Sequence, residues 1–263
     1  KDKMLASVSH STGKTFGEAL AESGYVGSEA NRIGPDKCAA LLELHIEQGP
    51  VLEAEKKDIG VVEGVCGMIN YEFTFVGQAD HAGTTPMKYR KDALYAACKV
   101  IQYLHDEFDK LDKKLVYTTG KISCHPNIHT IIPDLVKFTL DARHQDPAVV
   151  QQCIDIIKKI PSEVEKCAFS YEEAWSRATV AFHKPYVDFV EESAKELGYP
   201  SMRMYSGPGH DAQFAADIVP TTMIFVPSDG GHSHCELEHT PVENCKKGAD
   251  VLLNTVLKID AAI

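Results

Sequence analysis

The stretch CAALLELHIEQGP, residues 38–50, decides the fold class. Its first nine residues form a nearly continuous apolar run, which is typical of a strand covered on both faces, as in a parallel sheet. A second apolar run, VPTTMIFV at residues 219–226, has the same character. Polar residues follow both runs, and open α/β sheets bind their ligands at such strand ends. The sequence therefore predicts an α/β domain with a site where these two strands end.

Between these two runs the pattern changes near Gly67. Apolar residues alternate with polar ones from Ile69 to Phe75, which predicts a half-buried strand. The order of the elements is then β-α-β-β-α-β, as in a ferredoxin-like domain. The later elements are predicted as helices at residues 90–110 and 147–160 and strands at 115–124, 135–143 and 164–174.

We therefore expect three segments along the chain. A ferredoxin-like domain at residues 67–178 is inserted into an α/β domain made of residues 1–66 and 179–263. The last helix is well marked at its start, because Thr240, Pro241 and Glu243 provide an N-cap, a first-turn proline and a capping-box acid.

The composition excludes several classes of function. The 263 residues include 27 Lys and Arg against 38 Asp and Glu, a formal net charge of −11. This charge disfavours binding to nucleic acid or to an anionic membrane surface. The sequence has no apolar run close to the roughly 18 residues that span a membrane. Eight scattered cysteines without a CxxC pair predict reduced core thiols in a cytoplasmic protein rather than a disulfide framework.

Two histidines are candidates for metal binding. His45 lies at the end of the first apolar run, and His234 follows the second. A sheet that brings these ends together would offer two neutral imidazoles, which are common metal ligands. The alternative is that each is a hydrogen-bonded structural residue. A zinc site is usually completed by Asp, Glu or Cys, although the spacing here matches no zinc finger and Cys235 fits a packed thiol better. The candidates nearby in sequence are Glu47, Asp229, Cys235, Glu236 and Glu238.

Three more residues are candidates for substrate binding or for catalysis, and each has a plainer alternative. Arg143 ends a predicted strand and either captures a carboxylate or pairs with Asp141 or Asp146. Gly209, in the sequence GPGHD, either offers a backbone N–H to an anion or belongs to a tight turn. His81 lies in a small polar loop, where it is either merely exposed or donates to a developing oxyanion.

Taken together and in order, five motifs resemble those of the N-carbamoyl-L-amino-acid hydrolases. That group includes β-ureidopropionase-type and allantoate amidohydrolase enzymes, within the zinc aminoacylase and carboxypeptidase clan. The resemblance runs from about residue 41 to the C-terminus. The motifs are HIEQGP at 45–50, HAGTTPM at 81–87 followed by RKDA, PN and IIP followed by DAR at 141–143, GHDAQ at 209–213, and MIFVPS followed by GHSH at 231–234.

The resemblance implies an α/β metallohydrolase-type catalytic domain with two divalent metal ions, Zn²⁺ or Mn²⁺, interrupted by a lid that also forms a homodimer. His45 would ligate one metal and His234 the other. His81 would reach the partner subunit's active site and stabilise the oxyanion. Arg143 would hold the substrate carboxylate, and the backbone N–H of Gly209 would contact the same group.

Gln48 would also lie close to the substrate in a protein of this family. Thr130 occupies the position where the family has an asparagine that helps to bind the carboxylate. Threonine donates one hydrogen bond but lacks the paired geometry of an amide, so the substrate preference of this chain is open.

The family also carries an upstream His-x-Asp segment and a Glu-Glu pair, which supply metal ligands and the general base. The residues before His45 contain neither. Without these carboxylates the dinuclear site is incomplete and the attacking water lacks a proton acceptor. The α/β catalytic domain is therefore expected to be incomplete, and the 263-residue chain to be inactive by itself.

The implied reaction is metal-dependent hydrolysis of a linear C–N bond by an activated water. The implied substrates are an N-carbamoyl-L-amino acid, N-carbamoyl-β-alanine or allantoate. One alternative is a non-catalytic homologue that serves dimerisation or binds a ligand through Arg143. Another is a peptidase or aminoacylase of the same clan.

Overall fold

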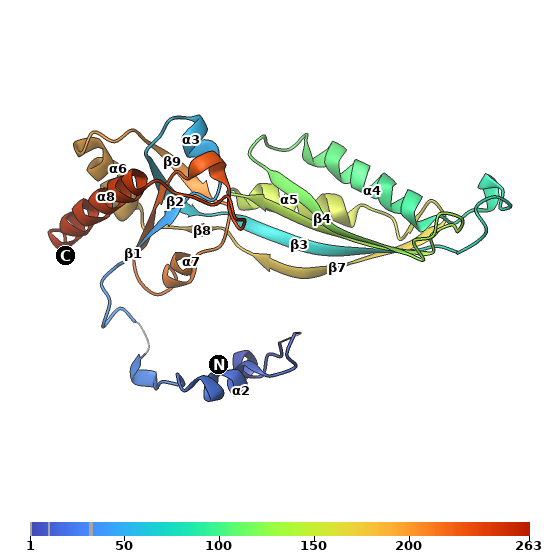
Figure 1. The fold of residues 1–263 in the computed structure, drawn as a ribbon, viewed down its shortest axis with the longest axis horizontal. Helices are drawn as coiled ribbons and strands as arrows, with labels where there is room; N and C mark the ends of the chain where they lie inside the picture. The colour runs from blue at the N-terminus through green and yellow to red at the C-terminus, as the bar shows by residue number, and fades with distance from the viewer. Residues whose placement is uncertain (1, 10, 32–33) are drawn as a thin grey trace. The chain divides into compact units, whose positions relative to one another are not determined.

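The computed structural model describes residues 2–9, 11–31 and 34–263, which form two compact units, residues 1–39 and residues 40–263 (Figure 1). The smaller unit contains α1 (Asp2–Leu5), α2 (Phe16–Ser23) and the 3-10 helix η1 (Glu29–Asn31). A capping box of Thr15 and Glu18 begins α2, and Gly24, at φ 76°, ends it. These capping residues explain the local boundaries of this helix.

The larger unit contains two five-stranded sheets. In the first sheet β1 (Leu41–Ile46) pairs in parallel with β10 (Thr221–Val226), so His45 lies opposite Phe225. The expectation that the two apolar runs lie side by side is confirmed. The sheet is mixed, however, because β10 is antiparallel to β2 (Ile59–Val65), a strand that the sequence reading missed. The other strands that pair with β2 are β8 (Val180–Ala181) and β9 (Ser201–Ser206).

Two long helices pack against the first sheet and against each other. The long helices α6 (Lys184–Glu196) and α8 (Val242–Asp260) supply Val190 and Val251 to its core. Gly248 lets α8 approach closely, since a Cβ there would lie 2.7 Å from side-chain carbons of Leu44 and Val226. All residues of β10 are buried, but those of β1 are only half-buried because β1 is at the edge of the sheet. The shorter elements are α3 (Val51–Ala54), α7 (Asp211–Ala215) and the 3-10 helix η3 (Asp229–Gly231).

The second sheet consists of β3 (Gly67–Val76), β4 (Val116–His125), β5 (Leu135–His144), β6 (Glu163–Val164) and β7 (Cys167–Arg177). Its strand order is β4-β5-β3-β7-β6, with antiparallel pairing throughout. Two helices cover one of its faces, and Phe73 stacks on Phe138 in the core between them (ring centroids 4.8 Å apart). The predicted β-α-β-β-α-β order and the α/β fold class are confirmed. The helices of this part of the chain are η2 (Met87–Tyr89), α4 (Ala93–Phe108) and α5 (Pro147–Lys158).

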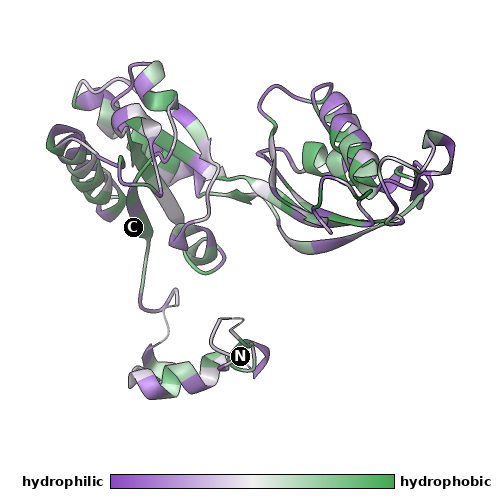
Figure 2. Cartoon of the chain, turned by 45° about the vertical axis from the view of Figure 1, so that its right-hand side comes forward, coloured by the Kyte–Doolittle hydropathy of each residue, from purple (hydrophilic) through white to green (hydrophobic). Residues whose placement is uncertain are grey.

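The distribution of apolar residues follows this architecture. Figure 2 shows apolar strands in both sheets, and helices in which apolar and hydrophilic residues alternate.

The domain boundaries expected at 66/67 and 178/179 fall between β2 and β3 and just after β7, and they stay a prediction. All eight cysteines are free thiols, but the expectation that most lie in the core is wrong: Cys153 and Cys167 are buried, Cys38, Cys66 and Cys124 are half-buried, and Cys98, Cys235 and Cys245 are exposed.

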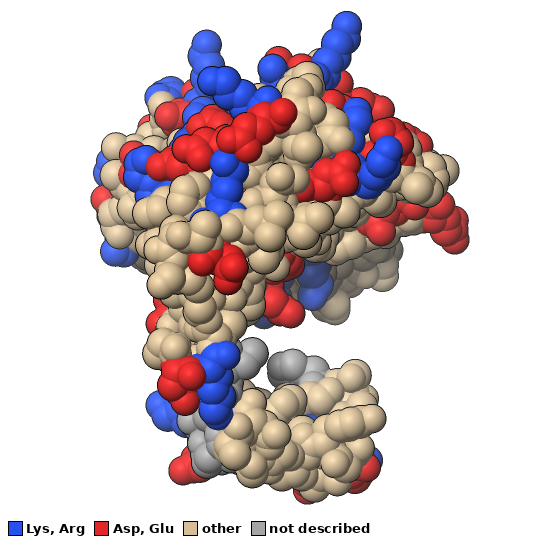
Figure 3. All heavy atoms as spheres, turned by 90° about the vertical axis from the view of Figure 1, so that its left-hand side faces the viewer, with Lys and Arg blue, Asp and Glu red and all other residues tan. Residues whose placement is uncertain are grey.

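Charged side chains of both signs are interspersed on the surface. Figure 3 shows this for the face that carries α6 and α8. Arg203 there pairs with Asp188 (2.7 Å) and Glu191 (2.6 Å), and Lys258 pairs with Glu196 (2.8 Å). In the described part of the chain, none of the helices combines the length and the apolar character that crossing a membrane requires.

Candidate functional site

A cavity of about 550 Å³ lies beyond the ends of β1 and β10. Gln48, Arg143 and His234 all line it, so the structure brings together three residues that the sequence singled out. The remaining lining residues come from the start of β4, from Asp141, from the loop after β9 and from the loop after β10: Val116, Tyr117, Thr118, Asp141, Gly207, Pro208 and Ser233.

The loops after β1 and β10 contact each other directly at this cavity. The Gln48 amide donates to Ser233 Oγ (3.0 Å) and lies 3.2 Å from His234 Nε2. Gln48 and His234 both have φ of 58°, a left-handed conformation that is uncommon for residues other than glycine. Gly231 makes the close approach possible, because a Cβ there would lie 2.4 Å from the backbone of Gly49. The two site loops are thus held in a specific, strained geometry.

Glu238 also holds the loop that carries His234 in place. Its carboxylate accepts hydrogen bonds from Ser233 Oγ (2.8 Å) and from the backbone N–H of His234 (3.1 Å). The Ser233 hydrogen bond, then the His234 N–H, and finally the charges of His234 and His45 lower the pKa of Glu238. An ionised carboxylate therefore lies within electrostatic range of both predicted metal ligands.

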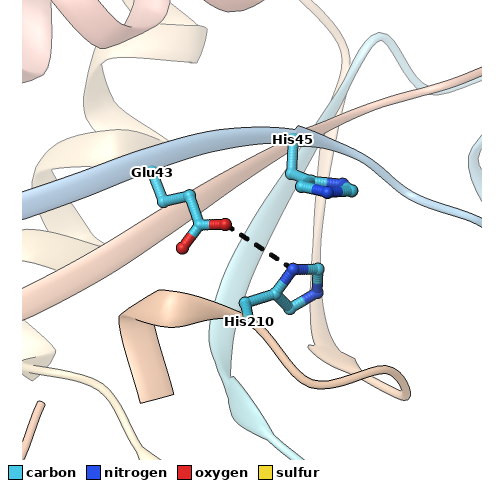
Figure 4. Close-up of side chains that lie close together, drawn as sticks. All are labelled: Glu43, His45 and His210. Atoms are coloured by element: carbon cyan, nitrogen blue, oxygen red, sulfur yellow. Dashed lines mark ion pairs between the residues drawn. The ribbon is translucent and has the colours of Figure 1, made fainter. Parts of the chain in front are cut away.

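A second cluster surrounds His45. Glu43 and His45 extend from the same side of β1, and His210 at the start of α7 faces them (Figure 4). One possible ligand atom of each residue lies within 4.8 Å of the others, so this group could hold a metal ion. Within the described residues it is the one group of three or more His, Cys, Asp or Glu side chains that meets this criterion. It contains His45 but not His234.

The hydrogen bonds fix where the protons of these imidazoles lie. His45 Nδ1 donates to the carbonyl of Ile46 (2.8 Å), which leaves the lone pair on Nε2. Ser206 donates its hydroxyl proton to the carbonyl of Pro208 (3.0 Å) and therefore accepts from His210 Nε2 (2.7 Å). The lone pair of His210 is then on Nδ1, 3.7 Å from Glu43 Oε1.

This arrangement suits a cation. Two acceptors, the Nδ1 of His210 and the carboxylate of Glu43, face each other without a proton between them. The other oxygen of Glu43 accepts from the backbone N–H of Ala212 (2.8 Å). Burial, followed by the charges of His45 and Arg177, lowers the pKa of His210 to about 4. The donor set of one carboxylate and two neutral imidazoles is typical of divalent transition metals.

Arg143 makes the ion pair that was the plainer of its two alternatives. Its Nε and Nη2 donate to the two oxygens of Asp141 (2.7 and 3.2 Å), and its Nη1 donates to the carbonyl of Gly207 (3.1 Å). The guanidinium lines the cavity with its charge partly balanced by Asp141. Its role toward a substrate carboxylate stays a prediction.

A side chain at Gly209 would displace the ends of two neighbouring side chains. A Cβ there would lie 2.5 Å from Nη1 of Arg177 and 3.2 Å from the amide oxygen of Gln213. At Gly207, two residues earlier, a Cβ would have nothing within 4 Å. The backbone of Gly209 is therefore held against a guanidinium that the sequence reading did not single out.

His81 and Thr130 lie together at the far end of the second sheet. The N–H of Ala82 donates to the carbonyl of Thr130 (2.8 Å), and His81 forms a β-bridge with Ile131. The N–H of Gly83 donates to Nδ1 of His81 (2.9 Å), so Nε2 of this exposed imidazole carries the proton. The ten-residue strand β5 runs from this end to Arg143, a distance of roughly 30 Å. Within one chain, these two residues are not part of the cavity.

Sequence reasoning missed two kinds of residue. Glu43 lies two positions before His45, and the two-residue period of a strand would have placed it on the same face. His210 was part of the GHDAQ motif but received no role of its own. Arg177 carries no local signal, since only the pairing of β7 with β3 brings it here.

Comparison with protein families matches residues 12–258 to the family described as "Peptidase family M20/M25/M40". The chain is 38% identical over 249 residues to an N-carbamoyl-L-amino-acid amidohydrolase of Rhizobium meliloti, covering 94% of this chain and 59% of that protein. It is 34% identical to the allantoate amidohydrolase of Escherichia coli K12, covering 91% and 59%. The chain thus spans about three fifths of the length of these curated relatives.

The fold is also shared with solved structures. A hydantoinase/carbamoylase family amidase from Burkholderia multivorans superimposes with a TM-score of 0.86 at 38% identity, covering 98% of this chain and 63% of that one. The chain belongs to peptidase family M20/M25/M40.

Proposed function

We propose that this chain takes part in metal-dependent hydrolysis of a linear C–N bond in an N-carbamoyl-L-amino acid, N-carbamoyl-β-alanine or allantoate. The observation that carries the proposal is the cavity of about 550 Å³ lined jointly by Gln48, Arg143 and His234. Relatives that are 38% and 34% identical are named for hydrolysis of such ureides.

In this proposal the metal is held at β1. Glu43, His45 and His210 offer a carboxylate oxygen and two lone pairs to one divalent cation, Zn²⁺ or Mn²⁺. His234 remains the predicted ligand of a second ion. Such ions, when bound, polarise a ureide carbonyl and lower the pKa of a bound water to near neutrality.

The chain's own residues then position the substrate. Arg143 directs its guanidinium into the cavity and would exchange part of its pairing with Asp141 for the substrate carboxylate. The Gln48 amide, fixed by Ser233, would donate to a polar group of the substrate. Val116 and Thr118 line the same cavity and would contact the substrate's substituent.

His81 and Thr130 fit this scheme through a second copy of the chain. Both are exposed and lie roughly 30 Å along β5 from Arg143. With Nδ1 fixed by Gly83, the Nε2–H of His81 is directed outward as a donor, as oxyanion stabilisation requires. We therefore include a homodimer, in which these residues complete the partner's site, as part of the proposal.

The reaction is tested with a substrate panel. Ammonia or amine release is measured from N-carbamoyl-L-amino acids, N-carbamoyl-β-alanine, allantoate and dipeptides, with Zn²⁺ or Mn²⁺ and after chelation. We expect the 263-residue chain to be inactive by itself, because the residues before His45 contain neither a His-x-Asp segment nor a Glu-Glu pair. We expect hydrolysis of at least one ureide when a polypeptide segment that carries these residues is supplied. Turnover of dipeptides alone, or no metal-dependent turnover of any ureide, would refute the proposal.

The metal site is tested separately on the 263-residue chain by titration with Co²⁺, followed by visible absorption. His45→Ala and His210→Ala are expected to weaken binding by at least tenfold each, as typical for loss of a ligand or its close partner. His239→Ala is the matched control, because that imidazole is exposed and pairs with Asp229. Binding that survives His210→Ala but not His234→Ala would assign the ion to His234 instead.

A further inference from the structure

Arg177 belongs to the second sheet but forms a hydrogen bond with a helix of the first. It is the last residue of β7, and its Nη1 donates to the amide oxygen of Gln213 in α7 (2.6 Å). Its Nη2 donates to the carbonyl of Cys66, the residue between β2 and β3 (3.0 Å). Since α7 packs on β1 and β10, Arg177 joins the end of the second sheet to an element of the first.

The helix α7 is short and depends on such contacts. Its five residues, Asp211–Ala215, make little more than one helical turn, and a helix of this length is unstable by itself. Ala212 is buried, and its N–H donates to the carboxylate of Glu43 (2.8 Å). Gln213 is buried as well, and its side chain accepts from Arg177. Hydrogen bonds to β1 and to Arg177 therefore hold this helix in place.

His210 lies at the start of α7 and faces Glu43, so its position follows that of the helix (Figure 4). Its carbonyl accepts from the N–H of Gln213 (3.2 Å), and its ring is buried. On its other side Gly209 packs on the guanidinium, since a Cβ there would lie 2.5 Å from Nη1 of Arg177. Arg177 thus contacts the chain both before and after His210. A displaced α7 would change the distance of 3.7 Å between Nδ1 of His210 and Oε1 of Glu43.

The two acceptors of Arg177 belong to different elements, and such a pair requires a forked donor. Nη1 and Nη2 have a fixed spacing in the planar guanidinium, so one side chain bonds to Gln213 and to Cys66 at the same time. A lysine ammonium lacks this fork and replaces only part of the arrangement. A methionine leaves both acceptors without their donor, and the buried amide of Gln213 then has a reason to reorient. The arrangement is therefore specific to arginine.

We propose that Arg177 is a positioning residue of the metal site, which fixes α7 through Gln213 and so keeps His210 opposite Glu43. That this group of side chains holds a divalent ion rests on the proposed function. Arg177 is not among the possible ligands and does not line the cavity of about 550 Å³, so it acts only through other residues. The last residue of the second sheet thereby sets the geometry of a proposed metal ligand beside the first.

The test combines Co²⁺ titration of the 263-residue chain, followed by visible absorption, with ¹⁵N NMR of the His210 ring in the metal-free chain. Arg177→Met is expected to weaken Co²⁺ binding by about tenfold, as is typical for loss of a residue that orients a ligand. It should also shift the absorption band of the bound ion and the ring signals of His210. Arg177→Lys should restore part of each effect. Gln213→Leu should weaken binding as much as Arg177→Met, and the double variant no further, because both changes remove the same contact.

The matched control is Arg203→Met, which removes an arginine held by three carboxylates and should leave the Co²⁺ affinity, the band and the His210 signals unchanged. If Arg177→Met does not fold, Gln213→Glu and Gln213→Leu decide instead, because glutamate keeps an acceptor for Arg177 and should keep binding, whereas leucine should not. Unchanged affinity, band and ring signals in folded Arg177→Met would overturn the proposal, as would additive effects in the double variant. If the unmodified chain binds no Co²⁺, the proposed metal site fails, and the His210 signals of the metal-free chain still decide the role of Arg177.

Discussion

The two sheets of the larger unit place chemically important residues by opposite rules. In the first sheet, the parallel strands β1 and β10 end at the same edge. Gln48 and His234 follow these ends and are 186 positions apart in sequence, yet their Nε2 atoms lie 3.2 Å from each other. In the second sheet, Thr130 and Arg143 are close in sequence but are separated by the length of β5. Parallel pairing concentrates the candidate site, whereas the antiparallel sheet carries its candidates to two distant ends.

This difference has a functional meaning. The first sheet can assemble a metal and substrate site within one chain, because its strand ends converge on Glu43, His45 and His210. The far end of the second sheet lies roughly 30 Å along β5 from that site, so in the proposed function His81 and Thr130 would contribute through another copy of the chain. The second sheet thus connects a local site with a remote one.

The largest expected effect is a loss of stability in the second sheet that leaves metal binding at the first sheet intact. Phe138→Ala removes a fully buried ring that stacks on Phe73, and should lower the free energy of unfolding of this sheet by about 3–5 kcal/mol. Urea unfolding measures the loss, while Co²⁺ binding at His45 should persist. Ile122→Ala, on the neighbouring strand but half-exposed, serves as control and should cost below about 1 kcal/mol. Loss of Co²⁺ binding in Phe138→Ala would show that the two sheets fold as one unit.

The next effect is the pH dependence of folding stability that His210 causes beside the first sheet. The pKa of His210 is lowered from 6.5 to about 4 by burial. Between these values the unfolded chain binds a proton that the folded chain does not, so stability is complete above pH 6.5 and is lost as the pH falls toward 4. The loss should be about 3 kcal/mol in metal-free chain. His210→Gln should abolish this slope, whereas His239→Gln, at an exposed position, should leave it in place.

A smaller effect tests the glycine loop between the two arginines. Gly209→Ala forces Arg177 to move, because the new Cβ would lie 2.5 Å from its Nη1. Binding of N-carbamoylglycine should weaken by about tenfold, which equals about 1.4 kcal/mol. Gly207→Ala is the matched control, since its Cβ meets open space. Equal affinities in the two variants would contradict the expected contact of the Gly209 N–H with the ligand.

The smallest effect is expected at the far end of the second sheet. Thr130→Asn should change the affinity of the dilute chain for N-carbamoylglycine by less than about twofold, because Thr130 is remote from the cavity. Thr118→Asn, at the cavity wall, provides the contrast and should change it more. An effect of Thr130→Asn that appears only at concentrations where sedimentation detects a dimer would support the action of this residue in the partner's site.

Much of this protein follows from local sequence patterns. The alternation from Ile69 to Phe75 defines one face of β3, and the apolar runs that end near His45 and before His234 define the paired strands β1 and β10. These features depend on the two-residue period of strands and on the polarity of each segment, which are properties of neighbouring residues. The strand β2 was missed because its glycines interrupt such a pattern.

Tertiary structure alone decided which of these residues meet. The proximity of His210 to Glu43 depends on α7 following β9 back to β1, and that of Arg177 to Gly209 depends on the pairing of β7 with β3. Likewise, Thr130 and Arg143 are separated because a rigid strand lies between them. Periodicity tells on which face a side chain lies, but the contacts between faces are set by long-range pairing and packing, which no local segment contains.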